Sequence, residues 1–284
     1  MAGELDRLLD LSRRRDRIFD DAIDEYVNEL RRIQGEVERQ VLRYISSLEA
    51  KGNTFNIDSQ LNFDIALNSN QVIRDAFVEA GFPQSITNLL DKYDDILDVV
   101  QDEYRLQRLP IEFKDADITA ITAIKEVDFR QFAQAGDVLS DTLSKRITEA
   151  VFMGQTRDQL AASVASALQG APGAESQLVN FSKTYANTAL HGFDQAVTAQ
   201  KAEEAEIDQF VYLGPSDALT RDFCSQYVGE VLSRKEIEQL SNGQGLDVFT
   251  FGGGYNCRHK WAPVSDTVAK SKQIRDFKER SQGS

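Results

Sequence analysis

The sequence predicts a mainly α-helical protein in which long amphipathic helices are followed by a small C-terminal α+β module. First, apolar residues recur every three or four positions through most of the first 205 residues, with charged residues between them. This is the pattern of helices that bury one face. Second, proline is scarce, with 5 in 284 residues. Third, after residue 206 the pattern changes to short β-rich runs and glycine-rich loops.

Composition and charge restrict the class of protein. Charged residues make up 27% and hydrophobic residues 41% of the chain, a balance that suits long, exposed helices. The net charge of −14 argues against nucleic acid as the main partner of the whole chain. Two cysteines exclude a disulfide framework. The first residues do not resemble a signal peptide and no apolar run is long enough to cross a bilayer, so we expect no membrane span and synthesis in a reducing cytoplasm.

Residues 4–50 are expected to form one amphipathic helix or a pair of helices, ended by the run around Gly52. Further helices are expected over residues 58–80, 85–109, 117–124, 129–152, 156–168 and 174–205. Asp58, Asp117 and Thr156 are the expected N-caps, because their side chains can accept hydrogen bonds from free backbone N–H groups. Six acidic residues against one lysine in residues 91–103 indicate a solvated helix face.

A basic run interrupts the apolar pattern of the first helix. It consists of Arg13, Arg14, Arg15 and Arg17. The run has two interpretations, a solvated helical turn or a contact with DNA or another acidic surface.

The C-terminal module is expected to contain strands over residues 207–213 and 230–232, a short helix over 220–227 and another helix capped by Ser233. The predicted parts of the chain are a helical region over residues 1–139, a second helical part over 140–205, the α+β module over 206–265, and a basic tail over 266–284.

Residues 217–263 contain both cysteines, the only tryptophan and one of the two histidines. Cys224, Cys257 and His259 are candidate zinc ligands, and Asp217 or a water could supply the fourth ligand. Two other interpretations are a buried thiol or disulfide staple, and a Cys224 nucleophile with His259 as its base. The metal and staple interpretations require the three side chains to lie close together. Zinc is the one cofactor considered, and no other is expected.

The glycine run of residues 252–254 resembles a phosphate-binding loop only superficially. It lacks the lysine and the strand-to-helix context that give such loops their chemistry. We expect these glycines to allow close backbone approach beneath Tyr255 and Trp261.

The order of rare residues in this segment resembles the signature of the phage Mu F-like minor head proteins, also called phage head morphogenesis proteins. Besides the cysteines and His259, the motif core comprises Asp217, Thr220, Arg221, Gly254, Tyr255, Asn256, Arg258 and Trp261. The helix restart at residues 154–160 and the helix containing residues 184–189 follow the family order, so the resemblance covers about residues 140–265. Many members end in His-Pro-x-Cys-Arg-Cys, whereas this chain has Tyr255, Cys257 and His259 in that region.

The resemblance implies a structural, non-enzymatic protein of the tailed-phage virion. Such a protein is made in the host cytoplasm, lies at the portal vertex of the head, and acts in head assembly and in DNA packaging or delivery. The implied partners are the portal protein, the major capsid protein, copies of itself and packaged DNA. Two alternatives are a DNA-contacting ejection protein that uses Arg13–Arg17 and the basic tail, and a metal-dependent or thiol hydrolase built on the cysteines and His259.

Overall fold

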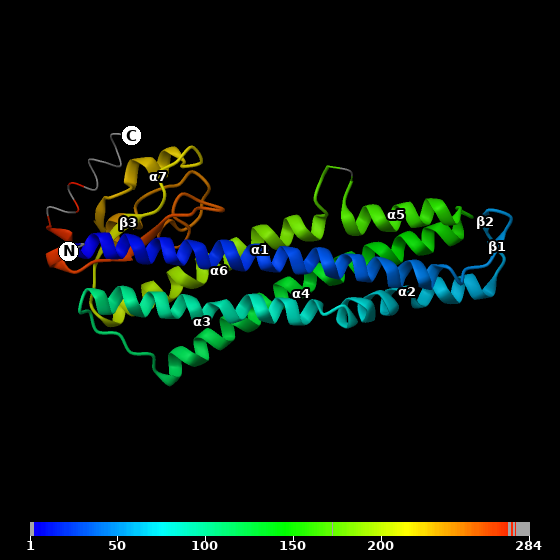
Figure 1. Cartoon of the computed structure of the whole chain (residues 1–284), viewed down its shortest axis with the longest axis horizontal. Coiled ribbons are helices and arrows are strands. Elements are labelled where there is room, and N and C mark those ends of the chain that lie inside the picture. The colour runs from blue at the N-terminus through cyan, green and yellow to red at the C-terminus, as the bar shows by residue number, and fades with distance from the viewer. Residues whose placement is uncertain (1–2, 172, 272–273, 275, 277–284) are drawn as a thin grey trace. The chain divides into compact units, whose positions relative to one another are not determined.

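The computed structural model describes residues 3–171, 173–271, 274 and 276, and in these residues the chain forms ten helices and five strands. The predicted class, mainly α with a small C-terminal α+β module, is confirmed. The long elements are α1 (Glu4–Ile45), α2 (Gln60–Glu79), α3 (Phe82–Leu106), α4 (Asp115–Phe152), α5 (Arg157–Gln169) and α6 (Gln177–Glu204) (Figure 1).

The chain divides into two compact units, each assembled from separated segments. Unit 1 comprises the described residues of Met1–Ala22, Asp91–Ile124 and Ala186–Ser284. Unit 2 comprises Ile23–Leu90 and the described residues of Lys125–Tyr185. Each of α1, α3, α4 and α6 contributes one part to each unit. This division differs from the parts predicted from the sequence, because it joins Met1–Ala22 and Asp91–Ile124 with the C-terminal part of the chain. The predicted boundary between residues 139 and 140 lies inside α4.

The first predicted helix is a single helix, α1. Its apolar side chains at spacings of three and four are fully buried in unit 2, as at Leu30, Ile33, Val37 and Val41. The helix ends at Ile45. The prediction that the run around Gly52 ends the helix is therefore wrong. This run forms the turn between β1 (Ala50–Lys51) and β2 (Thr54–Phe55), where Gly52 has a φ of 67°.

Two of the predicted N-caps are wrong. Ser59, not Asp58, caps α2 and accepts a hydrogen bond from the Asn62 N–H, whereas Asp58 is exposed and forms an ion pair with Lys51. Asp117 lies inside the first turn of α4, where its carboxylate forms an ion pair with buried Lys201. The two helices predicted on either side of residues 125–128 are one continuous helix, α4.

The third predicted N-cap is confirmed. Thr156 accepts a hydrogen bond from the Gln159 N–H, and the Gln159 side chain accepts one from the Thr156 N–H, which completes a capping box at the start of α5.

The C-terminal module is built on a three-stranded antiparallel sheet with the order β4–β3–β5. The predicted strands correspond to β3 (Gln209–Leu213) and β4 (Val231–Ser233), and Ser233 caps α8 (Arg234–Ile237) as expected. The predicted short helix is α7 (Asp222–Tyr227). The sequence did not predict β5 (Lys260–Pro263), α9 (Val248–Phe251) or α10 (Asp266–Ala269). Of the expected basic tail, Lys272, Arg275, Lys278 and Arg280 lie outside the described residues.

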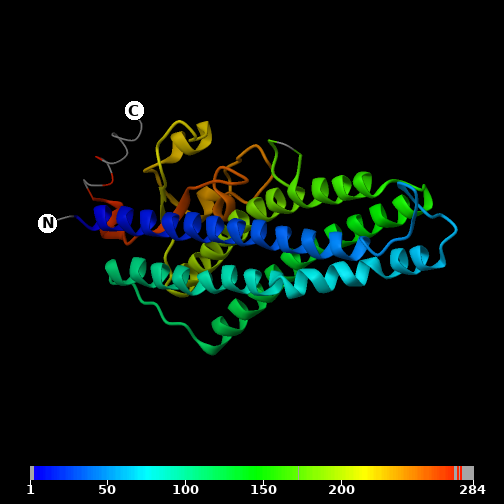
Figure 2. The same cartoon turned by 45° about the vertical axis from the view of Figure 1, so that its right-hand side comes forward.

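The sheet has apolar contacts on both faces because successive strand side chains alternate. Phe210, Tyr212 and Trp261 pack in one cluster with both cysteines. Val211, Leu213 and Ala262 pack in another with Leu5 and Leu8 of α1. Figures 1 and 2 both show the start of α1 beside β3. Across the residues that the structure describes, no helix has the length and apolar composition needed to cross a membrane.

Candidate functional site

Cys224, Cys257 and His259 lie together inside the C-terminal module. Cys224 projects from α7, and the other two residues precede β5. Their candidate ligand atoms all lie within 4.8 Å of one another, with 3.5 Å between the two sulfurs and 3.8 Å between Cys257 Sγ and His259 Nδ1. The predicted proximity is therefore confirmed. Both thiols are free and all three side chains are buried.

Tyr212 of β3 lies against this group and was not identified from the sequence. Its hydroxyl is 3.5 Å from each sulfur, and its ring stacks on the His259 imidazole with centroids 5.3 Å apart. Burial, followed by the charges of the two cysteines, raises the pKa of Tyr212 well above its usual value. The neutral phenol is therefore available as a hydrogen-bond partner of the sulfurs.

Two glycines of the 252–254 run allow the backbone to pass directly beside the thiols. A Cβ on Gly253 would lie 2.6 Å from Cys224 Sγ, and one on Gly252 would lie 2.6 Å from the Tyr212 hydroxyl. The Gly253 N–H also donates to Cys257 Sγ across 3.2 Å. The expected close approach is present, but it is made to the cysteines and Tyr212, whereas Tyr255 is exposed.

The two thiols differ in their tendency to ionise. The hydrogen bond from Cys224 is the main cause of the lowered pKa of Cys257, burial opposes it, and His259 and Tyr212 contribute in the same direction as Cys224. The same sulfur–sulfur contact, together with burial, raises the pKa of Cys224.

Asp217, the predicted alternative for a fourth metal ligand, lies outside the group. Its carboxylate oxygens accept hydrogen bonds from Arg258 across 2.6 and 2.8 Å, and one of them also accepts from the Leu219 N–H. The hydrogen bonds from Arg258 are the main reason that the pKa of Asp217 is well below its usual range. The carboxylate therefore clamps two loops of the module together, with Thr220 hydrogen-bonded beside it.

The other residues of the motif core also hold the module together. Arg221 donates to the Gly253 and Tyr255 carbonyls, and the buried Trp261 Nε1 donates to the Val248 carbonyl. Asn256 accepts from Asn187 of α6 and has a φ of 57°. Gly254 has a φ of 105°, a conformation that favours glycine.

The basic run does not form a single exposed surface. Arg13, Arg14 and Arg17 are exposed, and the first two form ion pairs with Asp10 and Asp102. Arg15, one of the four arginines considered for a contact with DNA, is not exposed. Its guanidinium is fully buried and pairs with Asp16 and Asp194, because α1 places every third or fourth side chain against the rest of unit 1.

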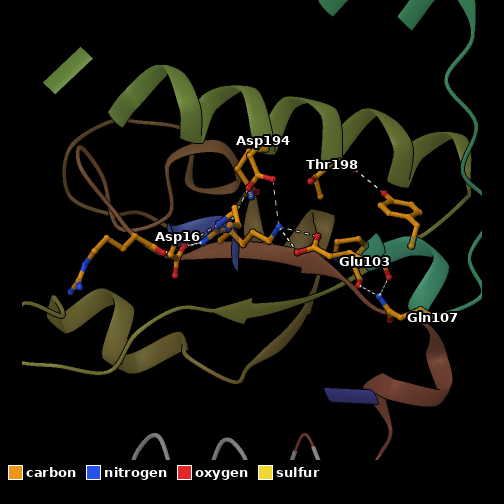
Figure 3. Close-up of polar contacts among 11 residues, drawn as sticks. Asp16, Glu103, Gln107, Asp194 and Thr198 are labelled. Carbon is orange, nitrogen blue, oxygen red and sulfur yellow. Dashed lines mark hydrogen bonds and ion pairs between the residues drawn. The ribbon is translucent and has the colours of Figure 1, made fainter. Parts of the chain in front are cut away.

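A buried ionic network continues from Arg15 and was missed by the sequence analysis. Lys260 Nζ lies 2.7 Å from a carboxylate oxygen of Glu103 and 3.5 Å from one of Asp194, and all three side chains are fully buried. Figure 3 shows the contacts extending from Asp16 through Asp194 to Glu103 and Gln107. Glu103 therefore does not belong to the solvated acidic face predicted for residues 91–103. Four separate segments supply the charges, so no local pattern could reveal them.

The two buried carboxylates of the network respond differently to their surroundings. Burial raises the pKa of Glu103, and this effect exceeds the opposing attraction of Lys260. Burial acts in the same direction on Asp194, but there the charges of Lys260 and Arg15 outweigh it and lower its pKa. Asp194 is therefore the stable anion at the centre of the network.

His191 of α6 is expected to make the fold sensitive to acid. It is buried against the edge of Phe19, and burial, followed by the charge of Arg15, lowers its pKa to about 4. In the unfolded chain the histidine has a pKa near 6.5. Between about pH 6.5 and 4 the unfolded chain therefore binds more protons than the folded chain, and the stability of the fold decreases as pH decreases. The free energy of unfolding of the unmodified protein should fall by on the order of 2 kcal/mol between pH 7 and 4.5 because of His191, and we expect His191→Gln to abolish this part of the loss.

Urea titrations of both proteins at pH 7 and 4.5 measure this effect. Asp194 and Glu103 titrate in both, so the difference between the two proteins isolates His191. An equal loss of stability in the two proteins would contradict the assignment.

Comparisons of the chain with family models, with curated proteins and with solved structures find no match.

Proposed function

We propose that this chain is a structural minor head protein of a tailed bacteriophage, associated with the portal and acting in head assembly and in DNA packaging or delivery. The observation that supports this proposal most directly is the use of the motif residues. Asp217 with Arg258, Arg221 with two loop carbonyls, and Trp261 with Val248 connect parts of the same small module. The residues that resemble the family signature thus serve to build a rigid module, as a structural component requires.

The space around the thiols supports a non-catalytic role. The cavity that Cys257 and His259 line has a volume of about 10 Å³. This volume accommodates about one water molecule and no organic substrate. A hydrolase would need room for a substrate carbonyl beside its nucleophile, and Cys224 itself is buried.

Exposed apolar side chains on unit 2 support a role in assembly. Large apolar residues with much of their surface exposed include Leu67, Val78, Val138, Phe152, Met153 and Phe181. Exposed apolar surface of this kind is commonly covered when a protein associates with others. The partners we propose are the portal protein first, then the major capsid protein and further copies of the chain, at the portal vertex of the virion.

Composition of purified heads tests the proposal. Heads from the phage that carries this gene should contain the chain at a small ratio to the major capsid protein, and portal complexes isolated from dissociated heads should retain it. Absence of the chain from heads, or an undiminished amount in heads assembled without portal, would contradict the proposal.

A pair of arginine variants connects this test to the module. Arg258→Gln removes the clamp on Asp217, whereas Arg234→Gln removes another arginine–carboxylate pair of the same module, with Glu238. We expect only Arg258→Gln to reduce the amount of chain in heads. Equal incorporation of both variants would exclude a role of the clamp in assembly.

The DNA-contacting alternative makes a different prediction. It requires strong, salt-sensitive binding of DNA by the isolated protein. The burial of Arg15 and the ion pairs of Arg13 and Arg14 favour the assembly role. Absence of DNA binding at low salt would exclude the alternative.

A further inference from the structure

We propose that Cys224, Cys257 and His259 bind one zinc ion, and that a water in the adjoining cavity completes the coordination. This inference concerns the internal chemistry of the module and is independent of the proposed role in the phage head. Its basis is the geometry of the three side chains, the space beside them and the lack, among the described residues, of a hydrogen-bond partner for His259 Nε2.

The distances between the three side chains suit zinc. Zinc binds sulfur at about 2.3 Å and imidazole nitrogen at about 2.0–2.1 Å in a tetrahedron, so two sulfurs lie about 3.8 Å apart and a sulfur and a nitrogen about 3.5 Å apart. The corresponding separations here are 3.5 Å between the sulfurs and 3.8 Å between Cys257 Sγ and His259 Nδ1. Shifts of a few tenths of an ångström would bring these two pairs to the coordination distances. The atoms of Cys224 and His259 lie within 4.8 Å of each other and would have to approach by at most about 1.3 Å. A disulfide would require the sulfurs to approach to about 2.05 Å.

The His259 ring has no other polar role in the part of the chain that the structure describes. Only 5% of the His259 surface is exposed, and its buried Nε2 has no hydrogen-bond partner among the described residues. The described contact of Nδ1 is with Cys257 Sγ. Gly214 permits this position, because a Cβ there would lie 2.3 Å from the imidazole. Neutral imidazole is a common metal ligand, and a bound ion would give this buried polar ring the partner that it otherwise lacks among the described residues.

The surroundings also suit a bound ion. The cavity of about 10 Å³ reaches both Cys257 and His259 and has room for one water as the fourth ligand. The Gly253 N–H and the Tyr212 hydroxyl can hydrogen-bond to the thiolates and so stabilise their charge and position. Zinc would connect α7 to the segment before β5 and close a loop of the chain between the two cysteines.

Metal analysis of the full-length protein tests the proposal. Protein purified under reducing conditions without chelator should contain about one zinc ion per chain, and His259→Ala and Cys257→Ala should each lower the content at least tenfold. Arg234→Gln is the control, because Arg234 forms an exposed ion pair of the same module with Glu238 and does not line this cavity, and it should retain the metal. Retained zinc in His259→Ala would overturn the assignment.

Cobalt binding keeps the proposal testable if a variant fails to fold. Wild-type protein freed of metal should bind one Co²⁺ with the visible bands of a tetrahedral site and the near-ultraviolet absorption of cobalt–thiolate bonds. Tyr212→Phe should retain these bands while weakening binding by roughly 10–100-fold. A folded wild-type protein that contains no zinc and shows no cobalt–thiolate absorption would overturn the proposal, and thiol titration would then distinguish a free thiol pair from a disulfide.

Discussion

Lys260→Met is expected to lower the free energy of unfolding by about 3–5 kcal/mol, the cost of removing one partner of a buried ion pair. The Lys260 ammonium lies between Glu103 and Asp194, and none of the three side chains is exposed. Arg15 still pairs with Asp194 in the variant, but Glu103 loses its closest cation. The principal cost is therefore an uncompensated carboxylate in the interior.

The loss should depend on pH in a defined direction. Burial already raises the pKa of Glu103, and removal of Lys260 raises it further. A carboxyl group with a raised pKa in the folded state stabilises the fold below its unfolded pKa and loses that contribution as pH rises through the folded value. The stability difference between Lys260→Met and the unmodified protein should therefore be largest at alkaline pH and should shrink as pH falls toward 5.

Urea denaturation followed by circular dichroism measures both effects. Lys270→Met is the matched control, because Lys270 forms an exposed ion pair with Asp266 and should change stability by less than about 1 kcal/mol. The double variant Lys260→Met with Glu103→Leu should be more stable than Lys260→Met alone, since it removes the unpaired charge. Equal effects of the two lysine variants would show that the network contributes nothing.

Trp261→Ala is expected to cost about 3–5 kcal/mol of stability, the usual loss for a buried aromatic side chain. Trp261 is fully buried, and its ring packs on Tyr212 with centroids 4.5 Å apart. Its Nε1 donates to the Val248 carbonyl, which in the variant would keep only its hydrogen bond from the Gly252 N–H among those described. Because Tyr212 contacts both cysteines, the cavity left by the tryptophan should also loosen the Cys–His group.

Tyr255→Ala is the matched control for this variant. Both aromatic residues belong to the motif core, but 53% of the Tyr255 surface is exposed. We expect its replacement to change the free energy of unfolding by less than about 0.5 kcal/mol. Thermal unfolding of the two variants measures the difference. If Tyr255→Ala were as destabilising as Trp261→Ala, burial would not be the property that makes Trp261 important.

The helical part of the fold follows from local sequence in most places. The apolar spacing predicted one or two amphipathic helices over residues 4–50, where the structure has α1, and Thr156 indicated the start of α5. The wrong caps show the limit of such reasoning. Ser59 follows Asp58 directly, and serine is as favourable an N-cap residue as aspartate. Asp117 forms an ion pair with Lys201, which is far away in the sequence. The predicted break at residues 125–128 contains neither glycine nor proline, so nothing there ends α4.

The candidate site shows the same limit. The rarity of cysteine, histidine and tryptophan indicated that Cys224, Cys257 and His259 belong together, and their proximity is confirmed. The sequence did not indicate that Tyr212 would contact both sulfurs, because a tyrosine in a strand is an ordinary core residue. It also suggested Asp217 as a ligand, whereas Arg258, just after Cys257, holds that carboxylate instead.

By itself, the sequence determined the helical class, the position of the C-terminal module and the grouping of its two cysteines with His259. These depend on hydrophobic periodicity, capping chemistry and the concentration of rare residues, all of which act over a few dozen positions. Only the tertiary structure decided that Arg15 is buried, that Lys260 is shared by Glu103 and Asp194, and that Gly253 leaves room for Cys224. Each of these depends on segments far apart in the chain, and the burial that makes a charge or a missing Cβ important exists only once they have packed.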